Sequence, residues 1–423
     1  MTAVIPDKNL GRVEIDFDVY NPFDEKVVRD PFDQFNTLLN EYPIAFHRGI
    51  NAWLIAPHAL VQEALKSPKF SARFTDWKDF PAPKPESQWN LYDRVQANSL
   101  LNLAPGEHQR VRRLTAPAFS RRVMDHIEER IKDTIVDIFD EIDDPAEFNA
   151  ATQIAQKVPI RSIARMVGVP PEAEEIFEHG LGWNMVRASN PMYSEAEREQ
   201  FINDALPGMQ YLLDSVAEHR ARRSLEDDFI GTLIKTSENG ESLNDLEIVS
   251  LISALVTAGA DTAVDLHTLA IHALLSHPDQ RQILRDRPEL MEDAIIEVIR
   301  YAGHGKFGGI PRFPYEDMDF HGQVMEKGTF VMPLFSTAWL DPAKWPEPRK
   351  FDITRDHAGN TIFGAGPHLC IGLNLVKVQG KLMIEEFERR FGDSAGLVGE
   401  IEYDPMHFNA RRMTTLMVKT RTK

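Results

Sequence analysis

One long apolar segment with helical periodicity constrains this fold more than any other feature of the chain. The segment from Leu243 to His277 follows the helical pattern, and Pro278 ends it. Ser242 and Asp245 have the spacing of a capping box at its start. With a rise of 1.5 Å per residue, such a helix spans about 50 Å. Its middle, LISALVTAGADTAV, is apolar on nearly every face, which predicts a central helix buried by the rest of the chain.

The organisation expected around this helix is a single large domain. The 423 residues contain no Gly/Ser linker, low-complexity tract or internal repeat. Hydrophobic residues make up 43% and charged residues 26%, as in ordinary globular proteins. We expect one mostly α domain over residues 1–423 with small β-sheets. A mixed β/α part reaches to about residue 75, and a helical part extends over about 76–423.

Charge and cysteine content exclude several classes of function. Lys and Arg total 47 against 65 Asp and Glu, a net charge of −18 that opposes nucleic-acid binding. A single cysteine excludes an internal disulfide and a zinc site built from several cysteines. The N-terminus lacks the pattern of a secretory signal, and no apolar run approaches the roughly 20 residues that span a bilayer. These features predict a cytoplasmic protein without a membrane anchor.

The remaining segments have readable local patterns. FHRGINAWLIAP predicts a hairpin with its turn at 48–51 and its return strand at 52–56. An irregular, Pro-containing segment follows over about 75–105, and such long loops often bind ligands. DFHGQVMEKGTFVM predicts a second hairpin with its turn at Lys327 and Gly328. Helices are predicted near Pro288, carrying EDAIIEVIRY, and at the end of the chain through Phe391.

The cysteine, Cys370, lies in the glycine-rich stretch TIFGAGPHLCIGLNL. Glycines let backbone approach a flat ligand closely, and the positive end of the helix that follows favours a thiolate. A lone thiolate facing a planar group suggests an axial ligand of haem iron. Considered by itself, the cysteine is better explained as a small buried hydrophobe. A nucleophile paired with His368 is a third interpretation, although residues so close in a loop seldom form such a pair.

Other polar residues also have ordinary explanations. Asp261 and Thr262 interrupt the apolar helix, but the hydroxyl can bond to the carbonyl four residues back and the carboxylate can belong to a buried ion pair. Glu297 and Arg300 lie one helical turn apart, a common spacing for charge pairs on a helix. His108 and Arg112 share one helix face, which a solvated basic surface would explain.

Together these motifs resemble the cytochromes P-450. The pattern F-G-x-G-x-H-x-C-x-G resembles the haem-binding loop of that family at every fixed position, here Phe363, Gly364, Gly366, His368, Cys370 and Gly372. AGADTA over 258–263 and the Glu297-x-x-Arg300 pair lie upstream in the family's order. The resemblance extends from about Asp16 to Phe408. It is similar to soluble bacterial members, and IDFDVYNPF, VPIRSIARMVGVPPE and MDFHG resemble the camphor-hydroxylating branch.

The resemblance implies roles for these residues. Cys370 would be the iron ligand of haem b, with Phe363, Gly364 and Gly366 in the loop that holds the cofactor. Thr262 would hydrogen-bond the dioxygen being activated, and Asp261 would control proton delivery. The haem propionates would be bound by four cationic or donor side chains, His108, Arg112, Arg312 and His368.

Glu297 and Arg300 would form the family's structural ion pair. The usual arginine of its third partner is replaced by Lys350, so that Arg349 or Arg355 is expected to substitute.

The residues expected to line the substrate side are mostly apolar. By family position they are Trp89, Leu91, Tyr92, Leu255, Ala258, Gly308 and Phe408. This lining favours a small, weakly polar organic molecule. The resemblance to the camphor-hydroxylating branch implies a terpenoid first, with an aromatic acid or a fatty acid as alternatives. The family's usual proline after Glu-x-x-Arg is absent, and Gly308 and Gly309 are expected to leave extra room beside the haem.

The function implied is a haem-thiolate monooxygenase that inserts one oxygen atom of O2 into a C–H bond. The sequence has no G-x-G-x-x-G after a strand and no iron–sulfur cysteines, so electrons are expected from a ferredoxin with its reductase and NAD(P)H. A basic surface for this partner is expected from Arg110, Arg113, Arg121, Arg122, Arg349, Lys377 and Lys381. Two alternatives are a peroxide-driven peroxygenase, whose members typically lack the Asp261–Thr262 pair, and a non-catalytic haem sensor, which would not need Thr262.

Overall fold

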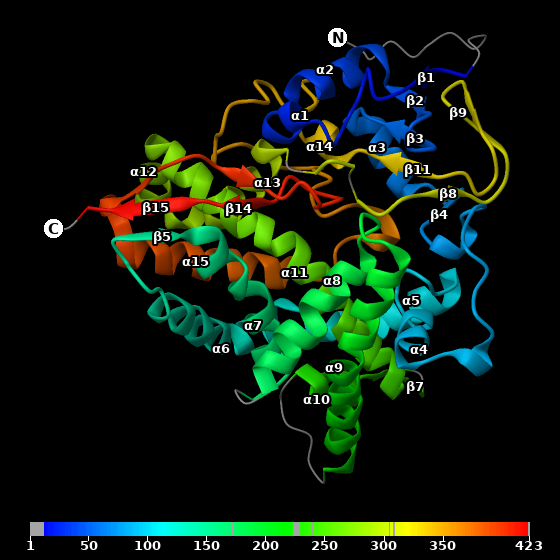
Figure 1. Ribbon diagram of the computed structural model, residues 1–423, viewed down its shortest axis with the longest axis horizontal. Helices are drawn as coiled ribbons and strands as arrows, with labels where there is room; N and C mark the ends of the chain where they lie inside the picture. Colours follow the sequence, from blue (N-terminus) through cyan, green and yellow to red (C-terminus); the bar gives the residue numbers. More distant parts are fainter. Residues whose placement is uncertain are drawn as a thin grey trace. The chain divides into compact units, whose positions relative to one another are not determined.

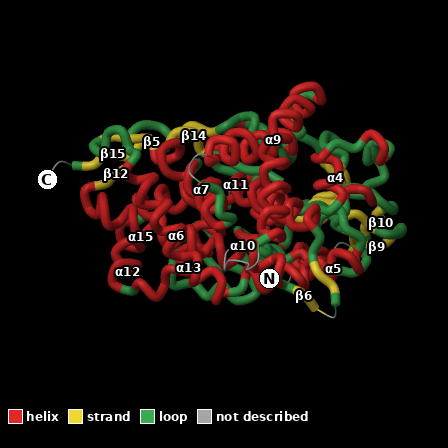
Figure 2. The backbone as a smooth tube through the Cα atoms, turned by 90° about the horizontal axis from the view of Figure 1, so that it is seen from below, coloured by secondary structure: helices red, strands yellow, loops and turns green. Residues whose placement is uncertain are grey.

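The structure is a computed structural model that describes residues 12–170, 173–222, 229–238, 240–303, 305–307 and 309–421. Helices form most of it, and the strands are short (Figure 2). The chain divides into two compact units. We call Met1–Ala82, Asp279–Cys370 and Tyr403–Arg412 the mixed unit, and Pro83–Pro278, Ile371–Glu402 and Met413–Lys423 the helical unit. The single-domain organisation expected from the sequence stays a prediction.

A four-stranded sheet forms the centre of the mixed unit. Its strands follow the order β1 (Glu14–Ile15), β2 (Ile44–His47), β3 (Ala52–Ile55) and β11 (Val331–Pro333). The first predicted hairpin is confirmed, because β2 and β3 pair antiparallel with His47 opposite Ala52. Alternate residues of β3 enter different cores: Trp53 and Ile55 pack in one buried cluster and Leu54 in another. This sheet is therefore buried on both faces.

The mixed unit also contains helices and shorter strands. They are α1 (Glu25–Arg29), α2 (Phe32–Glu41), α3 (His58–Lys66), β4 (Phe70–Ser71), α12 (Pro278–Asp286), α13 (Met291–Ala302), β8 (Phe313–Pro314), β9 (Met318–Phe320), β10 (Gln323–Met325) and α14 (Phe335–Trp339).

The turn of the second hairpin was predicted wrongly. Strands β9 and β10 pair with Phe320 opposite Gln323, so the turn lies at His321 and Gly322 rather than at Lys327 and Gly328. His321 has φ 52° and Gly322 has φ 84°. Two successive residues with positive φ match the twist of a tight hairpin, whereas Gly328 lies beyond the end of β10.

The helical unit is built around the long predicted helix, here α11 (Asp245–Ser276). It packs against α7, α9 and α15, and Figure 1 shows α15 running beside it. The other helices of this unit are α4 (Leu91–Ala97), α5 (Pro105–Thr115), α6 (Arg121–Asp140), α7 (Lys157–Met166), α8 (Asn184–Ser189), α9 (Glu195–Ala221), α10 (Phe229–Lys235) and α15 (Leu373–Phe391). Its strands are β5 (Glu147–Asn149), β6 (Ser237–Glu238), β7 (Glu241–Ser242), β12 (Ala395–Leu397), β14 (Met413–Thr415) and β15 (Met417–Thr420), and β13 (Glu402–Tyr403) ends at the boundary between the units.

The start of α11 differs from its prediction. Asn244 is the N-cap, and its side chain and that of Glu247 form the capping box, whereas Ser242 belongs to β7. By length and composition α11 is apolar enough to cross a membrane, but 67% of its apolar window is buried in the structure. This burial is what the sequence predicted for a core helix.

Candidate functional site

The cysteine loop lies in the mixed unit and is ordered by its own backbone. The N–H of Cys370 donates to the carbonyl of Phe363 at 2.9 Å, and that of Gly364 donates to Thr361 at 2.9 Å. A short helical turn over Gly366–His368 lies between them. Cys370 and its neighbour Leu369 are exposed, and Leu369 is 42% exposed. The loop therefore presents a thiol and an apolar side chain to its surroundings, which excludes the buried-hydrophobe interpretation of Cys370.

Gly366 is required for the close packing of this loop on α3. Its φ of 70° is unfavourable for other residues, and a Cβ there would lie 3.0 Å from the carbonyl oxygen of Leu65. Gly364 also has a positive φ, 79°, but a Cβ there would be no closer than 3.6 Å to other atoms. Packing thus accounts for Gly366 more fully than for Gly364.

Arg312 is a buried cation in the same unit, 3% exposed. Its Nη1 donates to the carbonyls of Ile310 at 3.0 Å and Pro311 at 3.2 Å. Among the described residues, no carboxylate lies within ion-pair distance of it. Burial lowers the pKa of Arg312 to about 10. A buried guanidinium held only by backbone carbonyls is suited to an anionic ligand, since an uncompensated charge is costly to bury.

Asp261 and Thr262 lie in the part of α11, the central helix of the helical unit, that is accessible to solvent. Ala258 and Thr262 are exposed and Asp261 is half-buried, whereas the helix on either side is largely buried. The Thr262 hydroxyl donates to the carbonyl of Ala258 at 2.9 Å, so the backbone bond expected as the ordinary alternative is present. Because a hydroxyl oxygen also accepts hydrogen bonds, Thr262 retains acceptor capacity toward a ligand.

The two predicted propionate ligands of the helical unit, His108 and Arg112, lie one turn apart on α5. His108 is 6% exposed, and burial lowers the pKa of its imidazole, with a smaller effect from Arg112. Arg110 of the same helix pairs with Glu107 and with Glu247 at the start of α11. The Arg110–Glu247 pair connects α5 to the helix that carries Asp261 and Thr262.

The Glu297–Arg300 pair of α13 is fully buried, with both side chains 0% exposed. Arg300 binds Glu297 through two bonds of 2.6 Å and 2.8 Å, a bidentate arrangement. Its remaining N–H groups donate to three backbone carbonyls, those of Trp339, Pro348 and Lys350, at 2.8 to 3.2 Å. One guanidinium therefore holds the segment that follows α14.

Two further residues contact Glu297: Arg355, one of the two arginines expected there, and His357, which was not expected. The Lys350 ammonium lies 3.6 Å from Asp352, and Arg349 pairs with Asp30, so neither contacts Glu297. Arg355 approaches Glu297 at 3.4 Å. The shorter bond comes from His357, whose Nε2 donates to Glu297 at 3.0 Å and whose side chain is 4% exposed. His357 was missed in the sequence because no local periodicity marks a loop histidine.

The residues expected to line the substrate side are divided between the units. In the helical unit, α4 carries Leu91 and Tyr92 and packs against α11, which carries Leu255 and Ala258. Trp89 precedes α4, and its indole N–H donates to the carbonyl of Lys84 at 2.8 Å. In the mixed unit, Phe408 stacks on Phe307 with ring centroids 4.8 Å apart. Gly308 lies outside the described residues.

The extra room expected at Gly309 is filled. A Cβ at this position would lie 2.4 Å from the ring of Phe335. Phe335 begins α14 and packs on the core cluster that contains Trp53. The absence of a side chain at Gly309 therefore accommodates an aromatic ring of the protein rather than a ligand.

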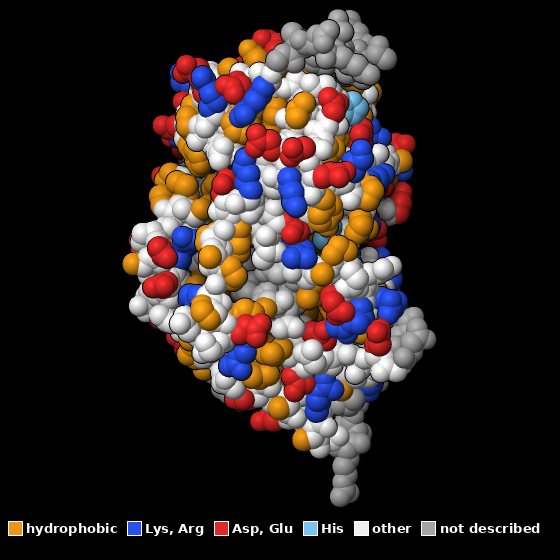
Figure 3. Space-filling model, turned by 90° about the vertical axis from the view of Figure 1, so that its right-hand side faces the viewer, with side chains coloured by type: hydrophobic (Ala, Val, Ile, Leu, Met, Phe, Trp, Pro, Cys, Tyr) orange, Lys and Arg blue, Asp and Glu red, His pale blue; other side chains and the backbone are white. Residues whose placement is uncertain are grey.

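Most of the expected basic surface is compensated by carboxylates. The ion pairs are Arg113–Glu241, Arg121–Asp125, Arg349–Asp30, Lys381–Glu128 and those of Arg110 already described. Figure 3 shows one face of the molecule on which basic and acidic side chains are interspersed. Counting these lysines and arginines alone thus overstates the positive potential that a partner would meet.

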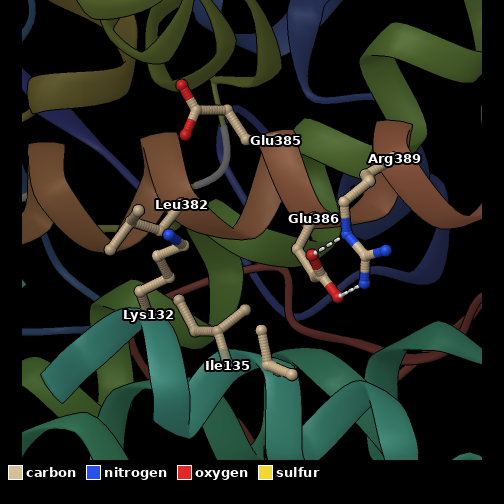
Figure 4. A pocket seen from close by; sticks show the side chains of 7 residues that line it. Lys132, Ile135, Leu382, Glu385, Glu386 and Arg389 are labelled. Carbon is tan, nitrogen blue, oxygen red and sulfur yellow. Dashed lines mark hydrogen bonds and ion pairs between the residues drawn. The ribbon is translucent and has the colours of Figure 1, made fainter. Parts of the chain in front are cut away.

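A cleft of about 190 Å³ in the helical unit lies away from the predicted site residues. Lys132, Ile135 and Val136 of α6 and Leu382, Glu385, Glu386 and Arg389 of α15 line it. Figure 4 shows Glu386 turned toward Arg389, with which it makes two hydrogen bonds of 2.6 and 2.7 Å. None of these residues was predicted as a site residue.

The residues present fit haem. The Cys370 thiol is exposed, so it is accessible to a ligand. Arg312 supplies a buried positive charge that a propionate would neutralise. One carboxyl group, of Asp261, and one hydroxyl, of Thr262, lie in the exposed part of α11. These donor types are those that a haem-thiolate protein needs.

Comparisons with known proteins identify the family of this chain. The sequence profile of the family described as cytochrome P450 matches residues 192–392. The chain is 30% identical to a vitamin D(3) 25-hydroxylase of Pseudonocardia autotrophica, over 84% of this chain and 83% of that protein. It is 28% identical to an epothilone C/D epoxidase of Sorangium cellulosum, over 88% of each chain. The structure of an epothilone B-bound cytochrome P450epoK superimposes with a TM-score of 0.85 at 24% identity, covering 96% of this chain and 100% of that one.

The Glu297 network predicts a specific acid sensitivity. Burial alone would raise the pKa of Glu297, but hydrogen bonds from Arg300 and His357 lower it below 4.5. A lowered folded-state pKa contributes stability that is complete above 4.5 and is lost as the pH falls through the folded-state value. Glu297→Gln should lower stability at neutral pH by about 3–5 kcal/mol. It should also flatten the stability profile below pH 4.5, where one proton contributes up to about 1.4 kcal/mol per pH unit.

Urea unfolding at a series of pH values measures this effect. Glu25→Gln, which changes an exposed carboxylate of α1, is the matched control and should leave the profile unchanged. Parallel acid slopes for wild type and Glu297→Gln would show that the native carboxylate is not protected by this network.

Proposed function

Because this chain belongs to the cytochrome P450 family of haem b oxidoreductases, we propose that Cys370 ligates the haem iron and that the protein oxygenates a small, largely apolar organic substrate. The family membership makes it a monooxygenase. The observation that carries the residue assignment is the exposed thiol of Cys370 in its glycine-containing loop. The proposed reaction inserts one oxygen atom of O2 into a C–H bond.

The bound cofactor supplies O2 activation and the redox chemistry of oxygen insertion. The chain's own residues hold it and manage protons. The Cys370 sulfur would ligate the iron and donate electron density to it. The residues proposed to bind the propionates are Arg312, His108, Arg112 and His368, since charge-assisted hydrogen bonds to carboxylates are strong.

Proton supply is assigned to the exposed part of α11. The Asp261 carboxylate exchanges protons with solvent and passes them toward the distal side. The Thr262 hydroxyl oxygen would accept a hydrogen bond from a water or from the ligand, while its own O–H remains on the Ala258 carbonyl. The helix on both sides of this stretch is largely buried, so its solvent contact is confined to these few positions.

The proposed substrate is a terpenoid, supported by the apolar side chains expected to line the pocket, among which Leu91 and Leu255 are buried. Compounds related to epothilones or to vitamin D(3) are a second candidate class of substrate, because two relatives are named for acting on epothilone C/D and on vitamin D(3). Aromatic and fatty acids remain alternatives. A spin-state titration of the ferric protein with terpenes, aromatic acids, fatty acids, epothilone D and vitamin D(3) ranks these classes directly.

Electrons are proposed to come from a separate ferredoxin with its reductase and NAD(P)H. Support comes from the sequence, which has one cysteine and no G-x-G-x-x-G after a strand. The compensated cations on α5 and α15 suggest that the docking contact depends on shape and apolar groups as well as on charge.

Cys370→Ser tests the ligand assignment. The CO-bound ferrous form should lose the thiolate-type haem spectrum, because a serine hydroxyl does not donate charge to iron as a thiolate does. Leu369→Ala changes the neighbouring exposed side chain and should retain that spectrum. Persistence of the thiolate-type spectrum in Cys370→Ser would remove the assignment.

Thr262→Ala tests the proton assignment. NADPH consumption should continue while peroxide release rises and product per NADPH falls at least about tenfold, since proton delivery at this position is lost. Thr257→Ala is the matched control, because its hydroxyl makes the same kind of backbone bond, to Ser253 at 2.8 Å. Equal coupling in Thr262→Ala and Thr257→Ala would show that the Thr262 hydroxyl only caps its own helix turn.

The ferredoxin contact should depend only weakly on salt. Reduction by an acidic ferredoxin should slow by less than about tenfold between about 50 and 300 mM salt, because paired cations attract a partner weakly. Glu241→Gln releases Arg113 from its ion pair and should steepen the dependence. Stopped-flow reduction of the ferric protein gives both rates. A steep decline in the wild type would instead indicate a surface of uncompensated cations.

A further inference from the structure

Lys306 of the mixed unit is a buried cation with no role in the proposed chemistry. Its side chain is 3% exposed. Among the described residues no carboxylate lies within ion-pair distance of its ammonium group. Burial lowers its pKa, and Asp404 only partly opposes this effect. Such a group is costly to bury unless a specific contact compensates it.

The contact of the ammonium group is a backbone carbonyl far away in the sequence. The Nζ of Lys306 donates to the carbonyl oxygen of His407 at 2.7 Å. The same Nζ lies 5.8 Å from the centroid of the Phe23 ring, within cation–π range. A charged donor makes a stronger hydrogen bond to a carbonyl than a neutral one does. The chain therefore uses a buried charge to hold one peptide group of the segment 403–412.

The backbone of Lys306 reinforces this link. Its N–H donates to the carbonyl of Asn409 at 2.9 Å, and Gly305 forms an isolated antiparallel bridge with Ala410. The N–H of Ala410 in turn donates to Nδ1 of His407 at 3.0 Å. The runs 305–307 and 407–410 thus form one small hydrogen-bonded unit.

Aromatic rings pack around Lys306 and its two hydrogen-bonded segments. Phe307 stacks on Phe408 with an interplanar angle of 27°. Phe307 also contacts Phe23, with centroids 5.7 Å apart. The Tyr20 hydroxyl donates to the carbonyl of Lys306. A segment near the N-terminus, the run after α13 and the segment near the C-terminus therefore meet at one buried lysine.

We propose that Lys306 is a positioning residue that fixes the direction of Phe408, and so sets the shape of one wall of the substrate pocket. The peptide group of His407, which it holds, directly precedes Phe408. This inference rests on the proposed function, in which Phe408 lines the substrate side. The neighbouring Met406 is 40% exposed, so this segment lies at the surface, where backbone segments open readily unless they are tied down.

Without the ammonium contact, the segment would keep the Asn409 backbone bond and the ring stack but lose its charged anchor. Its local opening should then become more frequent, and ligands of different size should be distinguished less well. A lysine that served stability alone would affect unfolding and haem content. It would leave the ratio of the dissociation constants for different ligands unchanged. The two roles therefore predict different measurements.

The test compares wild type, Lys306→Met and Lys327→Met in the full-length haem-loaded protein. Methionine matches the length of the lysine stem but cannot donate to His407. Lys327 is exposed, so its substitution makes the same chemical change without the anchor. Backbone amide hydrogen exchange of 403–412 and the ratio of dissociation constants for imidazole and for the larger miconazole, each read from the shift of the haem absorption band, are the two measurements.

In Lys306→Met, exchange in 403–412 should accelerate about tenfold or more relative to exchange in β2 and β3, and the miconazole-to-imidazole ratio should change about fivefold or more. Lys327→Met should match the wild type in both. Unchanged exchange, or faster exchange with an unchanged ratio, overturns the positioning role. Lys306→Gln, which keeps a donor that is too short to reach His407, gives the same comparison if Lys306→Met folds poorly.

Failure of this inference is distinguishable from failure of the proposed function. A wild type that lacks the thiolate-type haem spectrum would contradict the Cys370 assignment, whatever the behaviour of Lys306. A wild type with that spectrum, together with a Lys306→Met variant that matches it in exchange and in ligand ratio, would contradict only the role of Lys306.

Discussion

The buried pair of Glu297 and Arg300 is the interaction on which the mixed unit depends. Two charges without solvent exposure are stable only when every hydrogen-bonding group is used. Arg300 satisfies its N–H groups with Glu297 and with backbone carbonyls between Trp339 and Lys350. Glu297 receives the N–H of Asp352 and the ring of His357. This network orders an irregular segment that lacks helix or strand hydrogen bonds of its own.

The ordering of this segment also supports the loop that carries the Cys370 thiol. The segment held by Arg300 and Glu297 leads directly into the loop that ends at Cys370. Within that segment, the Asn360 side chain donates to the carbonyl of His357 at 2.8 Å and its oxygen accepts from the N–H of Ile362. The ion pair on α13 is therefore linked through short, local contacts to the loop proposed to hold the haem.

In the helical unit, the corresponding constraint is the rigidity of α11. Its N-terminus is capped, and it packs against α7, α9 and α15. Gly259 serves this packing, because a Cβ there would lie 3.0 Å from Ile163. The only polar, exposed stretch of the helix middle in the described residues is then displayed from a rigid support. A proton-handling pair gains accuracy of position from such a support.

Much of this architecture was predictable because it rests on local patterns. The apolar period of α11, the hairpin of β2 and β3, and the spacing around Cys370 are all properties of contiguous residues. The predictions that failed or stayed incomplete involve distant partners. His357 pairs with Glu297, and the ring of Phe335 fills the space beside Gly309. Carboxylates from other elements compensate the arginines expected to form a basic surface.

The sequence by itself determined the family, the mostly α fold and the candidate thiolate, because motif spacing and periodicity are recorded in neighbouring residues. Tertiary structure alone decided which charges are compensated, which glycines accommodate a neighbour and which lysine anchors the segment of Phe408. The physical reason is that hydrogen bonds, ion pairs and steric contacts between remote segments depend on distances of a few ångströms, and no local pattern in the chain specifies those distances.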